Sequence, residues 1–301
     1  MKRIIIDLST LAEHPMEIAM KEGEGAYMER VGVALKEAGH DVHIRLGGYA
    51  EGWQGGISYW PKERGPKVAD VLISTQRDVA DQNRVKNVIL ADKVWDVQPY
   101  SEATNGIPKV PGRLIWTAGA SRGLWHLMAM WPRLRERVPN ISITVAHNPA
   151  AYIDTMRWQH DFQGLFAQNL ERWFQEPGVT ALRRVEQKEV ERARAEAVMF
   201  VYPCDPIMGS RYHRSLSGTE AAKAGCALLF STEERLYQDF ENVAAFMEQP
   251  WHHDDWAEVV ADILTDDAKL AEWQAKAKAF ADGCTWERFV SEWDAKVQEA
   301  A

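Results

Sequence analysis

Hydrophobic and polar residues follow one another in blocks along this chain: a short apolar run, a loop, and then a longer amphipathic segment. Apolar runs of about four to eight residues are typical of buried strands, whereas apolar residues spaced three and four positions apart are typical of helices. The blocks recur along the chain without an internal repeat or a low-complexity tract. This pattern predicts an α/β fold in which helices cover a mostly parallel sheet.

The first half of the chain begins with a strand at residues 3–7, a loop through Gly23 and Gly25, and a helix that ends at Gly39. Further strands are predicted at residues 42–46, 71–74 and 88–91. Residues 47–70 are rich in glycine and are predicted to form an irregular loop.

The second half repeats the pattern more regularly, with a partly helical segment at residues 151–174. Strands are predicted at residues 113–117, 141–146, 179–182, 198–202 and 227–230, and helices at residues 124–137, 187–196, 217 onwards, 254–264, 268–281 and 285–299. Residues 98–112 carry three prolines and two glycines without periodicity, so we place a domain boundary in this segment.

Composition limits the class of protein. A chain of 301 residues, with 46% hydrophobic and 26% charged residues, has room for one large or two modest globular domains. No apolar run reaches the roughly 20 residues of a membrane helix, and the first run meets Asp7 at once, which indicates a buried strand and not a signal peptide. Three widely separated cysteines lack metal-ligand spacing and are expected to be buried thiols in a reducing cytoplasm; they are Cys204, Cys226 and Cys284.

Charge and aromatic content bear on the partners. The net charge of −9 disfavours a broad nucleic-acid-binding surface without excluding one, because charge can segregate between faces. The thirteen tryptophans are an excess. Most of them are expected in the core, although aromatic rings also suit stacking on bases and sugars.

The loop at residues 117–123 is the first candidate site. Ligands of open parallel sheets bind beyond the carboxyl ends of the strands, where helix N-termini suit a diphosphate. The small residues Gly119, Ser121 and Gly123 let a phosphate approach the backbone, and Arg122 supplies a permanent cation with bidentate geometry. The alternative is an ordinary strand-to-helix turn with a solvated arginine.

The second candidate loop leads into the helix near residue 217. Ser217, Gly218 and Thr219 have the pattern of a helix start with hydroxyl caps, and Glu220 is expected in the first turn. A carboxylate there either complements the helix dipole or accepts hydrogen bonds from two ribose hydroxyls.

Histidines offer two weaker candidates. His213 lies in the second candidate loop beside Tyr212, but a lone histidine is more often structural than catalytic. The pair His252 and His253, which two aspartates follow, invites a metal interpretation. Adjacent histidines point apart and no third ligand has suitable spacing, so we expect a helix start there and no metal site.

Several segments resemble one family in their order and spacing. The segments RLIWTAGASRGLWHLMAMWPRLRERVPNISITVA, VTALRRVEQKEVERARAEAVMFVYPCD and SLSGTEAAKAGCALLFS carry an Arg-Gly-Leu turn, a strand ending in Tyr-Pro, and a helix with Glu-Ala and then Ala-Gly. TNGIPKVPGRLIW leads into them, and FADGCTWERFVSEWDAKV closes the chain. Together they resemble the C-terminal domain of family 4-like GT-B glycosyltransferases (glycosyl transferases group 1). GEGAYMERVGVALKEAGHDVHI resembles that family's glycine loop and following helix, at Gly23 and Gly25, more weakly.

This resemblance implies a GT-B fold of two Rossmann-like domains that face each other across a cleft. The domains would be residues 1–103, an abbreviated acceptor domain, and residues 104–284, which bind the nucleotide-sugar, while the helix at 285–301 crosses back to the first domain. Family members usually retain anomeric configuration and need no metal or other cofactor. A UDP-sugar is the first choice of donor and a GDP-sugar the second.

The resemblance also assigns roles to residues. Arg122 would bind the donor phosphate and Glu220 the ribose. Ser217, Gly218 and Thr219 would place a helix N-terminus near the diphosphate, and Arg184 and Val185 would present backbone to the base. With Gly119, Ser121, Gly123 and Tyr212 these complete the expected donor site.

The chain departs from the family pattern at three positions. Tyr212 stands where the family often has a second glutamate, eight residues before Glu220. The family's arginine before the Arg-Gly turn is replaced near residues 116–117, and its first-domain histidine appears as Asp92 or not at all. Arg122, His213 and Asp92 are therefore the catalytic candidates, with Asp96 a further candidate for the general base.

The expected activity is sugar transfer to an acceptor hydroxyl by a hexosyl- or pentosyltransferase. The acceptor would be a hydroxymethylated base in phage DNA, or else a saccharide or protein; a DNA acceptor would use basic residues and tryptophans at 47–70 and 93–113. A non-catalytic scaffold that binds nucleotide-sugars is the alternative. A dinucleotide oxidoreductase is disfavoured, because no G-x-G-x-x-G follows the first strand.

Overall fold

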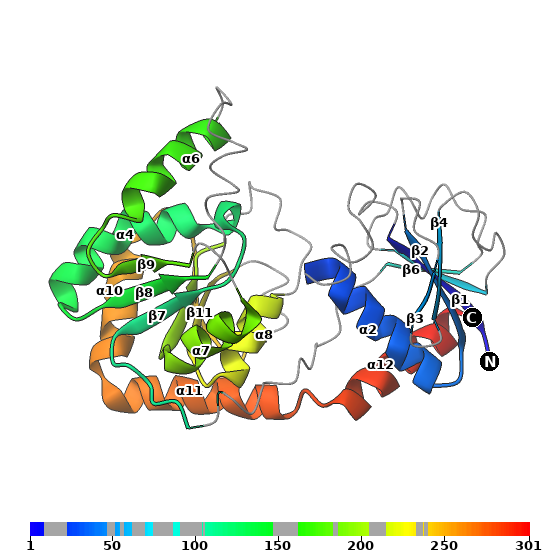
Figure 1. Ribbon diagram of the computed structural model, residues 1–301. Helices are drawn as coiled ribbons and strands as arrows, with labels where there is room; N and C mark the ends of the chain where they lie inside the picture. Colours follow the sequence, from blue (N-terminus) through cyan, green and yellow to red (C-terminus); the bar gives the residue numbers. More distant parts are fainter. Residues whose placement is uncertain are drawn as a thin grey trace. The chain divides into compact units, whose positions relative to one another are not determined.

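A computed structural model divides the chain into two compact units (Figure 1). Unit 1 comprises Met1–Val97 and Cys284–Ala301, and unit 2 comprises Gln98–Gly283. The structure describes residues 1–8, 23–46, 52–54, 57–61, 70–74, 87–90, 104, 106–146, 162–182, 186–204, 215–232, 237 and 240–301.

Unit 1 is built on a six-stranded sheet with the order β3-β4-β2-β1-β5-β6. All neighbouring strands are parallel except β3 and β4. Ile4, Ile5 and Ile6 of the central strand are all buried, as expected of a parallel strand with both faces covered. The elements are β1 (Arg3–Leu8), α2 (Gly23–Glu37), β2 (Asp41–Leu46), β3 (Gly52–Gln54), β4 (Ile57–Pro61), β5 (Val71–Ser74), β6 (Val88–Leu90) and α12 (Trp286–Ala300).

Two expectations for unit 1 were wrong. The segment 47–70 contains strands β3 and β4, which pair with each other antiparallel, and β4 extends the sheet beside β2. The missed signal is a Gly-Gly pair between two short β-prone runs, a spacing typical of tight hairpins. Gly23 and Gly25 belong to the first turn of α2 and not to a loop before it, because glycine is tolerated near a helix start, where few intrahelical bonds depend on it.

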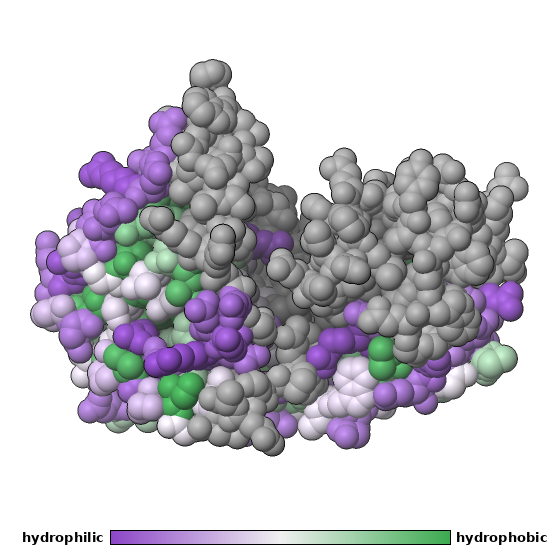
Figure 2. Space-filling model, viewed as in Figure 1, coloured by the Kyte–Doolittle hydropathy of each residue, from purple (hydrophilic) through white to green (hydrophobic). Residues whose placement is uncertain are grey.

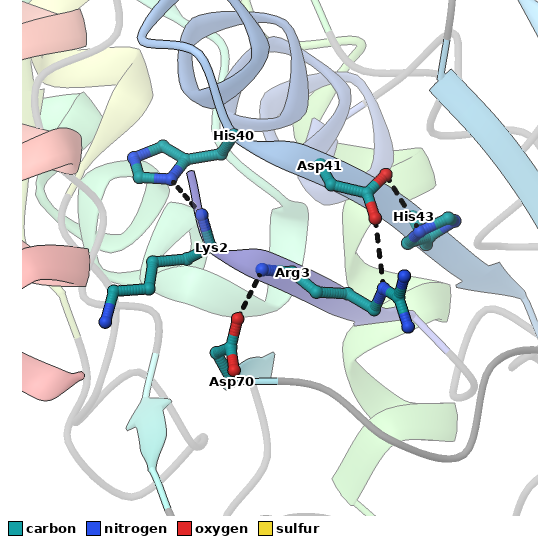
Figure 3. A network of polar contacts seen from close by, with 6 residues as sticks. All are labelled: Lys2, Arg3, His40, Asp41, His43 and Asp70. Carbon is teal, nitrogen blue, oxygen red and sulfur yellow. Dashed lines mark hydrogen bonds and ion pairs between the residues drawn. The ribbon is translucent and has the colours of Figure 1, made fainter.

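Polar side chains fix the starts of the unit 1 strands (Figure 3). The Asp70 carboxylate accepts a hydrogen bond from the backbone N–H of Arg3 at 2.7 Å. Asp41 pairs with the Arg3 guanidinium at 3.0 Å, and this contact lowers the pKa of the Asp41 carboxyl. The backbone N–H of Lys2 lies 3.3 Å from Nδ1 of His40. The starts of β1, β2 and β5 are thus tied together by side chains as well as by the sheet.

Helix α12 packs against α2 and completes unit 1. Nε2 of the buried His40 lies 2.8 Å from Oδ1 of Asp294, and this hydrogen bond lowers the pKa of the Asp294 carboxyl. The Trp286 indole donates to Glu37 at 2.8 Å, while the Arg30 guanidinium lies 5.3 Å from the Trp286 ring centroid. The C-terminal helix is therefore held by directed contacts as well as by its apolar face.

Unit 2 contains a second six-stranded sheet, with the order β12-β11-β10-β7-β8-β9 and all neighbours parallel. Its helices lie on both faces (Figure 1). Helix α10 packs on α4, and α11 packs on α8 and β11. The elements are β7 (Arg113–Trp116), η3 (Ala120–Arg122), α4 (Leu124–Arg137), β8 (Ser142–Val145), α6 (Phe162–Trp173), β9 (Val179–Ala181), α7 (Gln187–Glu196), β10 (Met199–Tyr202), α8 (Leu216–Lys223), β11 (Ala227–Ser231), β12 (Ala245–Met247), α10 (His253–Thr265) and α11 (Asp267–Asp282).

The burial of the tryptophans only partly follows the composition analysis. Among the tryptophans whose burial the structure describes, Trp116, Trp131, Trp256 and Trp293 are completely buried, whereas Trp125, Trp173, Trp273 and Trp286 are half-buried and Trp251 is exposed, so the expectation that most lie in the core is not met for these residues. The three cysteines are buried thiols, as expected. The described surface in Figure 2 mixes hydrophilic residues with scattered hydrophobic ones, as globular surfaces normally do. Among the described residues, no helix is long and apolar enough to cross a membrane.

The contact between His40 and Asp294 generates a prediction for unit 1. A carboxyl with a lowered pKa stabilises the fold above its unfolded pKa of about 3.9, and it loses this contribution as the pH falls through the folded value. Asp294→Ala should therefore lower the free energy of unfolding by about 0.5–1 kcal/mol at neutral pH, since the carboxylate is partly exposed. The difference from wild type should shrink below about pH 4.

Urea unfolding followed by circular dichroism across this pH range measures the difference. Glu299→Ala serves as the control, because Glu299 is an exposed acid on the same helix and should give no such pH-dependent loss. An equal loss in both variants would show that the hydrogen bond to His40 contributes nothing.

Candidate functional site

The order of the unit 2 strands defines where a ligand site is expected. Numbered along the chain within this sheet, the strands lie in the order 6-5-4-1-2-3, the doubly wound arrangement of dinucleotide-binding folds. The order reverses between β7 and β10, which are direct neighbours. In such sheets ligands bind beyond the carboxyl ends of the two strands at the reversal. The loops after β7 and β10 therefore form the candidate site.

A tight turn follows β7. The indole of the buried Trp116 donates to the carbonyl of Ala118 at 2.8 Å, which fixes the chain as it leaves the strand. The backbone N–H of Arg122 donates to the carbonyl of Gly119 at 3.0 Å and closes a short 3₁₀ turn. Gly123 then adopts a left-handed conformation, with φ of 107°, and helix α4 begins.

Gly123 is the point at which the two candidate loops touch. A Cβ added at this position would collide with the Pro203 carbonyl, whose carbon atom would lie 2.8 Å away. It would also lie 3.3 Å from Cα of Cys204. A left-handed conformation combined with so close a backbone approach requires glycine.

Arg122 points toward the end of the neighbouring strand. Burial raises the pKa of the Tyr202 phenol far above its ordinary value, and the Cys204 side chain raises it further. The Arg122 guanidinium acts in the opposite direction, through its charge and a hydrogen-bonding contact. The last residue of β10 thus holds a neutral hydroxyl beside the only charged side chain of the 117–123 turn.

The loop after β10 is anchored where the structure describes it. The backbone N–H of Cys204 donates to the Tyr202 carbonyl at 2.9 Å. The hydroxyl of the buried Ser231, at the end of β11, donates to the Cys204 carbonyl at 3.1 Å. These bonds keep Pro203 and Cys204 against the Gly123 turn.

Helix α8 starts earlier than the sequence pattern indicated. The cap is Ser215, whose hydroxyl oxygen accepts from the backbone N–H of Gly218 at 3.0 Å, and the helix begins at Leu216. Ser217 is therefore not the cap, and Glu220 lies in the second turn and not in the first. Several hydroxyl residues in sequence offer alternative caps, and packing selects among them, because a Cβ at Gly218 would approach the Phe230 ring to 2.8 Å.

Glu220 is engaged by an arginine from the preceding helix. Nη2 of Arg194, in the last turn of α7, donates to Oε2 of Glu220. The side chains are 8% and 20% exposed, respectively, so this ion pair is largely shielded from water. A carboxylate has about four acceptor sites, so the bond from Arg194 does not by itself occupy all of them.

The predicted site residues divide into three groups. Gly119, Arg122 and Gly123 come together in the turn after β7, with the backbone of Ser121 between them. Ser217, Gly218, Thr219 and Glu220 lie along α8. The remaining catalytic and donor-site candidates lie outside the described residues; they are Asp92, Asp96, Arg184, Val185, Tyr212 and His213.

The paired histidines start helix α10, as predicted. His252 is its N-cap and His253 its first residue. Nε2 of His253 lies 3.0 Å from Nδ1 of the buried His126, and burial lowers the pKa of His253. Within the described part of the chain, no cluster of three or more His, Cys, Asp or Glu side chains is arranged to hold a metal ion.

Sequence reasoning missed three residues of the site. The sequence pattern places Tyr202 only in a buried strand and Arg194 only in an amphipathic helix. It favours Ser217 over Ser215 as the helix cap. Only Ser215 carried a local signal, since a serine three residues before a glycine amide fits a cap as well as its neighbour does.

The fold defines a structural class. Two units, each with its own mostly parallel sheet and the second with doubly wound strand order, constitute the GT-B fold, and the prediction of this fold is confirmed.

Solved glycosyltransferase structures share this fold. WaaG, a glycosyltransferase involved in lipopolysaccharide biosynthesis, is 12% identical with a TM-score of 0.63, and 99% of each chain is covered. Sucrose-phosphate synthase from Thermosynechococcus elongatus is 10% identical with a TM-score of 0.69 and the same coverage of 99% for each chain. The UDP-forming α,α-trehalose-phosphate synthase from Burkholderia vietnamiensis is 12% identical with a TM-score of 0.52, over 89% of this chain and 72% of that one. No protein-family model and no curated protein sequence matches the chain. At these identities the similarity establishes the fold.

The glycine at the loop contact generates a prediction. Gly123→Ala should lower the free energy of unfolding by at least about 2 kcal/mol, because it combines a left-handed backbone with a collision at Pro203. Gly119→Ala is the matched control from the same turn. Its φ is −56° and a Cβ there would only touch the Arg122 side chain at 3.9 Å, so its effect should stay within about 0.5 kcal/mol.

Thermal unfolding of both variants by calorimetry measures this difference. Similar melting temperatures for Gly123→Ala and wild type would contradict the close approach of the two loops.

Proposed function

We propose that this protein is a glycosyltransferase that moves a sugar from a nucleotide-sugar donor to an acceptor hydroxyl. The observation that carries the proposal is the position of Arg122 at the reversal of the unit 2 strand order, on a turn pressed against the loop after β10. Similarity to glycosyltransferase structures over 99% of the chain supports it. Unit 2 would bind the donor and unit 1 the acceptor.

Arg122 would stabilise the leaving nucleoside diphosphate. A guanidinium stays charged at all working pH values and matches the geometry of phosphate oxygens. Negative charge develops on the diphosphate as the bond to the sugar breaks, and a fixed cation beside it lowers the barrier. The Tyr202 phenol would help to fix the guanidinium. Metal-independent transfer with retention of configuration is the version of this reaction that we favour.

Glu220 would recognise the ribose. A carboxylate that accepts from two vicinal hydroxyls positions the nucleoside and distinguishes a ribose from a deoxyribose. The N-terminus of α8 would add a favourable dipole for the diphosphate. Within this scheme Arg184 and Val185 would meet the base, and a UDP-sugar remains the first donor to test. One solved structure of similar fold is the pneumococcal O-GlcNAc transferase GtfA in complex with UDP and GlcNAc.

The acceptor that we propose to test first is a hydroxymethylated base in DNA, with a saccharide or a protein as the alternatives. Salt-sensitive binding to such DNA is the expected signature.

A non-catalytic nucleotide-sugar-binding protein is the second candidate function, and Tyr212, in place of the family's glutamate, favours it. Sugar transfer to any acceptor would support the glycosyltransferase and contradict the non-catalytic binding protein.

Nucleotide binding provides the first test of the proposal. A thermal-shift screen uses UDP, GDP, ADP and TDP, and the nucleotide-sugars of each. One of the four nucleotides should raise the melting temperature of the protein. A ligand at about 100 times its dissociation constant stabilises the native state by roughly 2.7 kcal/mol. Arg122→Ala and Glu220→Ala should each abolish or strongly reduce the shift.

Arg135→Ala is the matched control for this screen, because Arg135 is an exposed arginine on α4, away from the turn. In a transfer assay, Arg122→Ala should lower kcat by about 10²–10³-fold. Unchanged nucleotide binding and unchanged transfer kinetics in Arg122→Ala would contradict the proposal.

A further inference from the structure

A compact group of polar side chains joins the last turns of α7 and α8. It consists of Lys109, Arg194, Glu220 and Cys226, and we refer to it as the α7–α8 cluster. None of its members lies in the loops at the ends of β7 and β10. The cluster is linked to the proposed donor site only through Glu220, the residue to which the proposed function assigns the ribose.

Lys109 bridges the C-terminal ends of both helices. Its ammonium group donates to the carbonyl of Ala197, the C-cap of α7, at 2.5 Å, and to the carbonyl of Ala224, the C-cap of α8, at 2.6 Å. Burial lowers the pKa of the Lys109 ammonium. A cation is well placed here, because the last carbonyls of a helix carry partial negative charge. The separation of the two helix ends is thereby fixed.

Cys226 strengthens the same junction from the start of β11. Its thiol lies 3.3 Å from the Ala197 carbonyl and 3.7 Å from the Arg194 carbonyl. The residue is completely buried, and burial raises the pKa of its thiol. Neutral and inaccessible, this thiol serves as a weak donor to the last turn of α7. The backbone that carries Arg194 is therefore held on the β11 side as well.

Arg194 is the member that acts on Glu220. Its guanidinium donates to one carboxylate oxygen of Glu220, and only 8% of the arginine side chain is exposed. The helix backbones on both sides of this ion pair are tied by Lys109, so the carboxylate is held in one orientation. An ionised carboxylate is purely a hydrogen-bond acceptor, as the recognition of two hydroxyl donors requires.

We propose that Arg194 is a positioning residue that sets the Glu220 carboxylate to receive the two hydroxyls of a ribose, so that the preference of the protein for ribonucleotides depends on it. The inference rests on the proposed function. It adds a residue that does not itself touch the nucleotide and that acts through the carboxylate.

The test measures a ratio of affinities and not a single affinity. Isothermal titration gives the Kd of UDP, GDP and ADP and of their 2′-deoxy counterparts. A hydrogen bond to a charged group corresponds to a preference of about 10–100-fold for the ribonucleotide in the wild type. Glu220→Gln should reduce this ratio to about threefold or less. Arg194→Met should reduce it at least about threefold while binding of the deoxynucleotide changes little.

Two further variants separate positioning from general destabilisation. Arg194→Lys keeps a positive charge and should recover part of the preference. Arg194→Met combined with Glu220→Gln should have the same ratio as Glu220→Gln alone, because the arginine acts only through the carboxylate. Arg192→Met is the matched control. Arg192 lies on the same helix and pairs with Glu196, but its side chain is 73% exposed, so the ratio should stay at the wild-type value.

Each outcome decides between the hypotheses. If Arg194→Met does not fold, the ratio of ribonucleotide to deoxynucleotide affinity is compared with wild type in Arg194→Gln and Arg194→Lys instead. A wild-type preference for ribonucleotides that survives these substitutions overturns the role of Arg194 and leaves the proposed function standing. Equal affinity of the wild type for ribo- and deoxynucleotides overturns the inference and the ribose-binding role of Glu220, and it leaves sugar transfer from a nucleotide-sugar donor standing. Failure of the wild type to bind any of the nucleotides contradicts the proposed function and the inference with it.

Discussion

The backbone of Gly123 lies against the carbonyl of Pro203, and most of the candidate site depends on this contact. It joins the loops of the two strands between which the strand order reverses. A larger residue would push the loops apart, and Arg122 would move away from the end of β10. The hydrogen bond from Ser231 to Cys204 and the one from Trp116 to Ala118 hold the two sides of the same contact. A fixed cation at a switch point is the feature from which the proposed chemistry follows.

The second part of the proposed site, Glu220 on α8, is positioned by residues outside the site. Helix α8 carries Glu220, but its position is set by a neighbouring helix and by Lys109 in the segment that leads into β7. The proposed donor site therefore combines a turn fixed by backbone packing with a carboxylate fixed by buried charge. Buried ion pairs contribute little net stability on average, yet removing one partner leaves an uncompensated charge. Orientation of a ligand-binding group gives such a pair a function beyond stability.

Local sequence signals predicted the regular elements well. The helices at 124–137 and 187–196 have the bounds that their periodicity indicated, as does the strand at 71–74, because each has an uninterrupted pattern and a clear end. The sequence pattern did not predict the short or glycine-flanked strands, namely β3, β4 and the partly exposed β12. In these strands pairing with a neighbour outweighs a weak local preference.

The contacts of the site that the sequence did not predict are between side chains that lie far apart in the sequence. The turn at Arg122 was found because small residues beside a basic one are a local motif. Arg194 and Glu220 are separated by 26 positions, and no local pattern connects them before the helices pack together. The same holds for Tyr202 beside Arg122, since these residues come from strands that are adjacent only through the reversal of strand order. Residue types therefore suggested the candidates, and topology selected their partners.

A crystal structure of the protein with a nucleoside diphosphate bound would test the central claim most directly. The account predicts that the diphosphate lies within hydrogen-bonding distance of Arg122 at the carboxyl ends of β7 and β10, with the ribose hydroxyls on Glu220. A nucleotide bound elsewhere, with Arg122 and Glu220 making no contact to it, would contradict the account.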